Sequence, residues 1–171
     1  QRGYNLVREL GRGAEVHLLA FVHPDVLPTA AAIAGSQVEL EKHCRHVEYF
    51  PLWAKTSIAH KLLAAGTSAL SSRPFSVIAH RSAAFQRRVT ETLKSAAFDI
   101  VHVDTLALAP FVDRSVPTPT VLTHHNIESM LMGRRAQVET RPLLKRFLAR
   151  ESAKLATAER EMSPQFDMNI V

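Results

Sequence analysis

The chain has 171 residues, which is enough for one domain with a sizeable hydrophobic core. Apolar residues make up 46% of it, which excludes a disordered tail, and no apolar run approaches the roughly 20 residues of a membrane span. The single cysteine, Cys44, excludes an internal disulfide framework, so we expect a buried or idle thiol. A net charge of +5 favours anionic partners without choosing between nucleic acid, phospholipid and a phosphorylated metabolite.

The first third of the chain alternates predicted helices and strands. Apolar side chains recur on one helical face within residues 4–10, and Gly11 supplies the stop. Residues 15–21 then predict a strand, and residues 47–50 predict a second, shorter strand that a proline closes. The alanine-rich stretch 29–34 between them favours neither element.

Two helices are predicted in the middle of the chain. The first covers residues 54–70, where apolar side chains fall at helical spacing. These side chains are Ile58, Leu62, Leu63 and Leu70. After Pro74 interrupts the pattern, Phe85, Val89 and Leu93 recur every four residues and predict a helix with a basic outer face.

The last third of the chain predicts three more strands separated by helices. Residues 100–103 and 120–123 are short apolar runs, typical of buried parallel strands, and a short helix is predicted between them at 106–112. A long helix follows, and we expect Thr140 to cap it. The closing residues, 168–171, predict the last strand.

This alternation of strands and helices predicts crossover connections and a parallel sheet. We therefore expect an α/β fold with a doubly wound parallel sheet, formed as one domain over residues 1–171. No internal repeat, low-complexity tract or linker divides the sequence. Because the chain starts inside a helical pattern and ends inside a strand pattern, we expect it to be a fragment.

The segment 120–129 (TVLTHHNIES) carries the strongest functional signal, because two histidines and an asparagine stand where a strand meets a helix. In open α/β sheets, ligands bind at such junctions, and the helix N-terminus offers backbone N–H groups to anions. For His125 and Asn126 we favour binding or proton handling over the alternative that Asn126 only caps the helix. Alternation along the strand turns His124 away from its neighbour, so a core role is favoured there.

Asp104 and Thr105 follow the neighbouring predicted strand in the equivalent position. A carboxylate at this place could bind a sugar hydroxyl or act as a base, and it could equally cap the short helix that follows. His102 lies within the strand, and we assign it to packing.

Other catalytic and binding patterns are missing from the sequence. Adjacent histidines lack the spacing of a zinc site, so we expect no metal. The sequence also contains no dinucleotide-binding glycine loop, phosphate-binding loop or serine nucleophile elbow.

The segment 120–162 is basic, which indicates either a solvated surface with local ion pairs or a strip facing anionic lipid or a phosphorylated acceptor. Its basic residues are Arg134, Arg135, Arg141, Lys145, Arg146, Arg150, Lys154 and Arg160. Interleaved aromatic residues are missing, so we expect no nucleic-acid partner.

The order of these pieces resembles the N-terminal half of a GT-B glycosyltransferase of family four. The matching stretches are NLVRELGRGAEVHLLAF, FDIVHVDTL and PTVLTHHNIES, followed by the long helix RFLARESAKLATAERE and a closing strand. The resemblance spans nearly the whole chain. Its most specific part is the junction of strand, His-Asn and helix, and HNIES is similar to bacterial exopolysaccharide-type members.

The resemblance implies two Rossmann-like domains across a cleft, with the nucleotide-sugar donor held mainly by the C-terminal one and the acceptor by the N-terminal one. It implies hexose transfer, with retention, to a polysaccharide, lipid-linked or small-molecule acceptor, and with no cofactor or essential metal. His125 matches the family's histidine that contacts the donor sugar, with His124 as the alternative. We expect Asn126, Asp104 and Thr105 to bind donor or acceptor beside it.

The resemblance also implies that two parts are missing. A first strand with a glycine-rich turn would precede Gln1, and the donor-binding domain would follow the chain, so we expect the isolated chain to be inactive. The implied location is the cytoplasm, with peripheral contact to anionic lipid at the inner face of the membrane as a further option. The alternative function is a non-catalytic α/β binding module whose basic helices contact anionic lipid or a protein. A weaker alternative is an epimerase of GT-B shape.

Overall fold

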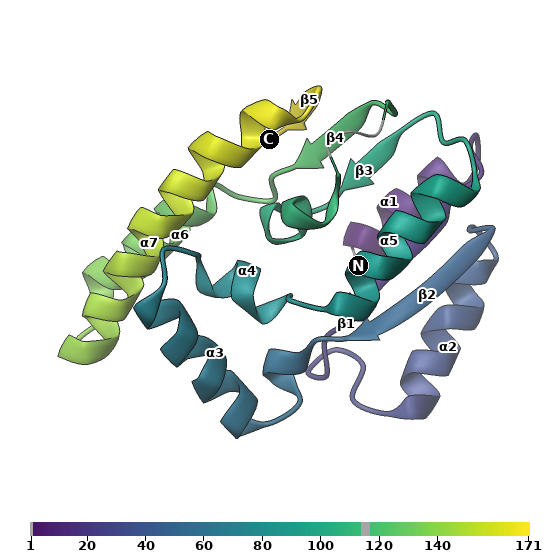
Figure 1. The fold of residues 1–171 in the computed structure, drawn as a ribbon. Helices are drawn as coiled ribbons and strands as arrows, with labels where there is room; N and C mark the ends of the chain where they lie inside the picture. The colour runs from purple at the N-terminus through teal and green to yellow at the C-terminus, as the bar shows by residue number, and fades with distance from the viewer. Residues whose placement is uncertain (1, 114–116) are drawn as a thin grey trace.

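The computed structural model describes residues 2–113 and 117–171 and shows an α/β fold with parallel strands in two small sheets (Figure 1). The described strands are β1 (His17–Val22), β2 (His46–Pro51), β3 (Val101–Val103), β4 (Thr120–Thr123) and β5 (Met168–Ile170). The described helices are α1 (Arg2–Leu10), α2 (Ala30–Glu41), α3 (Ile58–Leu70), α4 (Phe75–Ala79), α5 (Ala83–Ser95), α6 (Glu128–Val138) and α7 (Pro142–Met162), with short 3₁₀ helices η1 (Trp53–Lys55), η2 (Leu106–Phe111) and η3 (Ser163–Gln165). The predicted alternation of helices and parallel strands is confirmed.

The parallel strands are divided between two sheets. In the first, β1 pairs with β2 from His17 opposite His46 to Val22 opposite Pro51. In the second, the order is β3-β4-β5, and Leu122 at its centre is fully buried. Among the described residues no strand of one sheet pairs with a strand of the other, so the single sheet that the sequence predicts is present as two pieces.

The turn after α1 shows why a glycine stands there. A Cβ on Gly11 would collide with the backbone carbonyl oxygen of His43, which follows α2. The ambiguous alanine-rich stretch begins α2, and the Thr29 hydroxyl caps that helix by accepting a hydrogen bond from the Ala32 N–H at 3.1 Å. Cys44 is buried beside these elements, as expected, and burial raises the pKa of its thiol.

The start of α7 differs from the sequence prediction. The helix begins at Pro142, and Arg141 is the flanking residue, with an extended backbone and no side-chain cap. The residue before a proline is disfavoured in the helical region, so the boundary falls at Arg141. Thr140 lies one residue too early, and its predicted capping role is wrong.

The predicted apolar face of α3 is helical but not buried. The exposed fractions of Ile58, Leu62 and Leu63 are 80%, 67% and 61%. Instead, the helix packs on its small side chains, and Ala64 and Ser68 are both fully buried. Periodicity predicted a helix here, and the helix covers Ile58–Leu70, but periodicity does not show which face is buried.

A buried polar network joins α7 to the end of α3 and the start of α4. Glu151 accepts hydrogen bonds from the Ser68 hydroxyl and the Phe75 backbone N–H, both at 2.6 Å. Lys154 forms an ion pair with Glu151 and donates to the Ser68 carbonyl oxygen at 2.7 Å. Lys154 therefore lies in the interior and does not belong to the predicted basic strip, whose other seven members are exposed.

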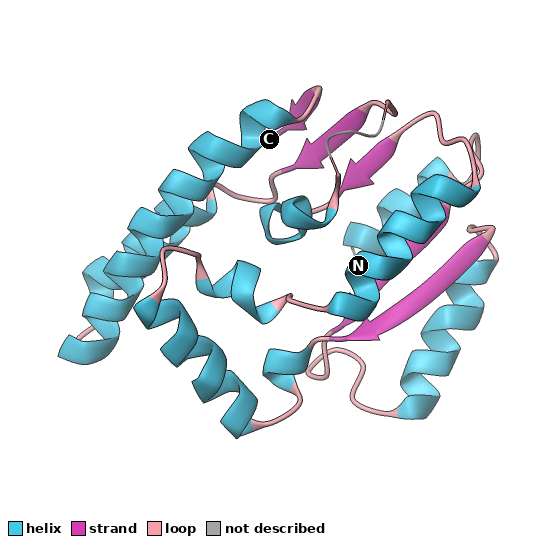
Figure 2. Cartoon of the chain, viewed as in Figure 1, coloured by secondary structure: helices cyan, strands magenta, loops and turns pink. Residues whose placement is uncertain are grey.

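Two apolar clusters hold the carboxyl ends of the strands in place. Phe21 stacks on Phe85 with ring centroids 4.5 Å apart, and this contact ties β1 to α5. In the second sheet, Leu122 and Val103 pack with Ala158 of α7. Figure 2 shows α7 lying along α6 at the side of the β3-β4-β5 sheet, so the long helix supports the exit of β4.

Candidate functional site

The candidate site lies where β3 and β4 end. Val103 pairs with Leu122, so the residues that follow the two strands leave the sheet side by side. Asp104 and Thr105 follow β3, and the histidine pair follows β4. Parallel pairing thus brings together the two polar segments that the sequence separates.

His125 and Asp104 form the central contact of the site. The His125 Nε2 atom lies 3.2 Å from Asp104 Oδ2, and the two side chains are 35% and 43% exposed. Asp104 Oδ1, by contrast, is buried and has no hydrogen-bond partner in the described structure. A buried acceptor without a partner is costly, and such atoms are uncommon in folded proteins.

His124 faces the neighbouring strand rather than His125. Its backbone N–H donates to the Ile170 carbonyl oxygen at 2.7 Å, and its ring Nε2 lies 3.0 Å from Asn169 Oδ1. Both contacts extend the pairing of β4 with β5. His124 therefore ties the two strands together, and Asn169 is a partner that sequence reasoning missed because it lies 45 residues away.

Asn126 and Thr105 occupy different environments. Asn126 is exposed, and the residue that flanks α6 is Ile127, which makes no side-chain cap, so capping by Asn126 is wrong. The Thr105 hydroxyl donates to Glu128 Oε1 at 3.2 Å. Thr105 thereby connects the exit of β3 to the first residue of α6.

Glu128 is a half-buried carboxylate that the sequence argument did not include. Burial, the largest cause, raises the pKa of Glu128, and the nearby Glu159 raises it further, while the Thr105 hydrogen bond lowers it. The HNIES motif contains this glutamate, but Glu159, which raises its pKa, belongs to α7. Sequence spacing alone therefore gave no signal for it.

The N-terminus of α6 is already occupied by a protein carboxylate. Glu159 of α7 accepts hydrogen bonds from the Ser129 backbone N–H at 3.0 Å and from its hydroxyl at 2.5 Å. One of the backbone N–H groups that could have bound a phosphate is thus used inside the protein. The expectation that the start of the helix offers N–H groups to an anion therefore does not hold for Ser129.

His102 is the middle residue of β3 and stands two residues before Asp104. Its Nε2 atom lies 2.7 Å from the Thr123 hydroxyl, and burial lowers the pKa of the ring, with Asp104 opposing and His125 adding to the shift. A lowered pKa favours neutral imidazole at pH 7. His102 is thus hydrogen-bonded across the strand pair, in keeping with the packing role assigned to it.

The chemical character of the site follows from these groups. It combines imidazoles, carboxylates and an exposed amide, all of which hydrogen-bond hydroxyl groups. The described contacts of these side chains include no lysine or arginine. Among the described residues, no group of three or more His, Cys, Asp or Glu side chains is arranged to hold a metal ion.

Comparison with protein families, curated proteins and solved structures gives no match to this chain. Within the described part of the chain, none of the helices combines the length and the apolar character that crossing a membrane requires.

Proposed function

We propose that the chain is the sugar-handling domain of a retaining glycosyltransferase and supplies half of an active site at the carboxyl edge of β3 and β4. The observation that carries this proposal is the contact of His125 with Asp104 beside the exposed Asn126. Such a group of neutral and acidic hydrogen-bonding side chains suits sugar hydroxyls. It does not suit a diphosphate, which we assign to a second, donor-binding domain with GT-B geometry.

His125 is the residue to which we assign contact with the sugar. The Asp104 carboxylate at 3.2 Å favours a proton on Nε2 of the neutral ring. Nδ1 is then an acceptor that can bind a sugar hydroxyl. A fixed polar group at this place orients the sugar and stabilises positive charge that develops at its anomeric carbon as the nucleoside diphosphate leaves.

The proposal is tested with a panel of nucleotide-sugar donors. We expect the longer protein that carries this chain and a donor-binding domain to hydrolyse or transfer at least one sugar. The isolated 171 residues should transfer none, because the proposal assigns diphosphate binding to the second domain. Sugar transfer by the isolated chain, or none by the longer protein across the panel, would contradict the proposal.

A second function is favoured by one surface observation. Ile58, Leu62 and Leu63 of α3 are exposed, and Lys61 stands among them. An apolar helix face with a basic residue suits the surface of an anionic membrane. As a non-catalytic module, the chain would sediment with phosphatidylglycerol vesicles, would not do so with phosphatidylcholine, and would lose binding in Leu62→Asp.

A further inference from the structure

The carboxylates of Glu128, Glu151 and Glu159 differ in how many hydrogen bonds the protein gives them. Glu159 accepts hydrogen bonds from Ser129 at both of its oxygens. Glu151 also accepts at both oxygens. Glu128 accepts only one, from the Thr105 hydroxyl to Oε1, and within the described part of the chain nothing donates to its Oε2 atom. Glu128 is therefore the least satisfied of these three carboxylates.

The free oxygen of Glu128 is in contact with solvent. Among the described residues, the buried side-chain oxygens and nitrogens without a hydrogen-bond partner are Ser76 Oγ and Asp104 Oδ1, and Glu128 Oε2 is not one of them. The rest of the Glu128 side chain is partly buried, and the Thr105 hydroxyl binds its other oxygen. The protein thus holds Oε2 in a defined position where a ligand can reach it.

Glu128 lies at the same edge of the sheet as His125. Asp104 and Thr105 are consecutive residues at the end of β3, and they contact His125 and Glu128, each at 3.2 Å. Consecutive Cα atoms are about 3.8 Å apart, so the two contacts are anchored one residue from each other. A single sugar ring can therefore reach both side chains.

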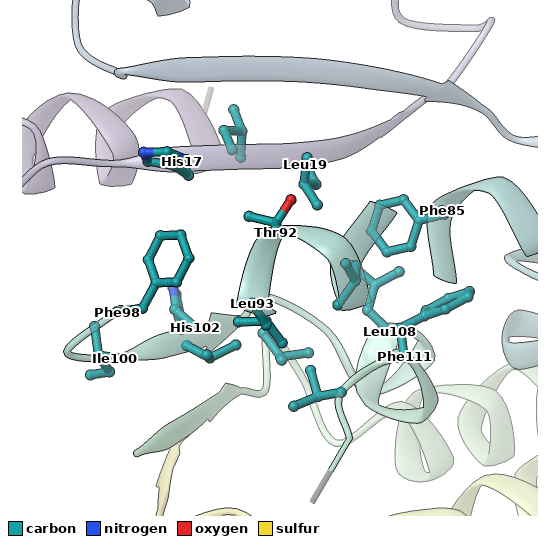
Figure 3. Close-up of a pocket in the computed structure, with 15 residues that line it drawn as sticks. His17, Leu19, Phe85, Thr92, Leu93, Phe98, Ile100, His102, Leu108 and Phe111 are labelled. Atoms are coloured by element: carbon teal, nitrogen blue, oxygen red, sulfur yellow. The ribbon is translucent and has the colours of Figure 1, made fainter. Parts of the chain in front are cut away.

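This polar edge is separate from the apolar groove between the two sheets. The groove is a cavity of about 170 Å³ whose walls come from β1, α5, β3 and η2, and Figure 3 shows Phe85, Leu93 and Phe111 among the side chains that line it. Neither Glu128 nor His125 lines the groove. A sugar needs hydrogen-bond partners for its hydroxyl groups, and it finds them at the edge rather than in the groove.

The burial of Glu128 has a cost that a ligand can offset. Burial raises the pKa of Glu128, Glu159 raises it further, and the nearby His125 opposes the shift. The charged form is therefore less well stabilised than it is in water. A hydroxyl group that donates to Oε2 would stabilise it, and a hydrogen bond to a charged acceptor is stronger than one between neutral groups.

We propose that Glu128 is a second sugar-binding residue, which accepts a hydrogen bond at Oε2 from one hydroxyl group of the donor sugar that His125 contacts. This inference rests on the proposed function and adds a determinant of substrate specificity to it. A carboxylate only accepts hydrogen bonds, so Glu128 selects sugars with a free hydroxyl group at that ring position and rejects those that carry an ether or an ester there. Thr105 is the residue that positions the carboxylate.

The test pairs a side-chain variant with donors that lack single hydroxyl groups. Transfer is measured in a protein that carries this domain together with the proposed donor-binding domain, with the nucleotide sugar that it uses and with monodeoxy analogues of that sugar. We expect Glu128→Ala to raise KM for the parent donor about tenfold or more and to change kcat less than about threefold, because the lost hydrogen bond holds ground state and transition state alike. Glu128→Gln keeps an acceptor and should raise KM less.

One of the monodeoxy donors identifies the hydroxyl group that Glu128 binds. With the wild type, kcat/KM for this donor should fall at least about tenfold, whereas with Glu128→Ala it should fall little further, because the contact is already lost. The remaining monodeoxy donors should lose the same factor with both proteins. Glu161→Ala, which removes an exposed glutamate of α7, is the matched control and should leave KM unchanged. Circular dichroism confirms that each variant is folded.

The outcomes separate this inference from the proposed function. If the wild type transfers a sugar and Glu128→Ala has the same KM, the role of Glu128 is wrong and the proposed function stands. If every monodeoxy donor loses the same factor with Glu128→Ala as with the wild type, Glu128 is only structural. If the wild type transfers no sugar from any donor, both proposals are overturned. Should Glu128→Ala not fold, the donors are compared with Glu128→Gln, which should reduce the penalty for the identified donor at least about threefold.

Discussion

His124 and His125 are adjacent in the sequence but have different surroundings in the fold. The ring of His124 contacts Asn169 of β5, whereas the ring of His125 contacts Asp104 and remains more than one-third open to solvent. The first contact lies in the framework of the sheet, and the second lies where a ligand can reach it. The alternation of side-chain direction along a strand predicted that His124 and His125 point to different sides.

The ionisation of Glu128 predicts a pH dependence of stability. Because the pKa of Glu128 is raised above its ordinary value of 4.5 in the folded protein, the carboxylate costs stability as the pH rises through that raised pKa. Glu128→Gln removes this cost and keeps an acceptor for Thr105. We expect the variant to be more stable than the wild type at pH 7 and nearly equal at pH 4, by urea unfolding. An advantage that is greater at pH 4 would contradict the assignment.

Gly11 predicts a steric effect with a matched control. Gly11→Ala places a Cβ against the His43 carbonyl oxygen, and we expect it to lower the free energy of unfolding by roughly 1–3 kcal/mol, as overpacked sites do. Gly13→Ala, two residues later, has open space around its Cβ and should have little effect. Urea unfolding of both variants makes the comparison, and equal effects would show that the close approach is not tight.

At the scale of elements, α7 connects helices from both halves of the chain. It places Glu159 at the start of α6 and the Glu151–Lys154 pair against Ser68 of α3. Ser152 of the same helix donates to the Ser129 carbonyl oxygen at 2.8 Å. The position of the α6 N-terminus, and with it Glu128, therefore depends on α7.

The buried ion pair predicts a large and asymmetric mutational effect. Glu151→Gln leaves Lys154 charged and uncompensated, and we expect a loss of about 3–5 kcal/mol in the free energy of unfolding. The double variant Glu151→Met/Lys154→Met should recover much of this, since apolar pairs can replace buried ion pairs. Arg87→Ala, which removes an exposed pair with Glu91, serves as a surface control with little expected effect. A double variant less stable than the single one would contradict this account.

Across the whole molecule, the elements that depend on neighbouring residues were predictable from the sequence. The contacts between residues far apart in the chain were not. The apolar run at β4 and the four-residue spacing of Phe85 and Val89 depend on neighbours in the chain, and the structure confirms both elements. The approach of His125 to Asp104 followed from parallel strand order. The roles of Glu159 and Asn169 were not predictable, because each depends on contacts made 30 or more residues away.

The division of the sheet and the exposed face of α3 were missed for the same reason. Periodicity shows which side chains share a face, but it does not show what covers that face. β1 has the sequence of an interior strand, yet its residues are only half-buried, and the apolar side chains of α3 are exposed. Such disagreement between pattern and burial marks the two surfaces where this domain can meet another segment or partner.

The most direct test of the proposed function compares two histidine variants in a protein that carries this domain together with the proposed donor-binding domain. With the donor that supports transfer, His125→Ala should lower kcat/KM at least about 100-fold, as loss of a group that stabilises the transition state does. His124→Ala should lower it less than tenfold, because that ring contacts Asn169 and not the ligand. Equal activity of His125→Ala and wild type, with both proteins folded, would contradict the assignment of the active site.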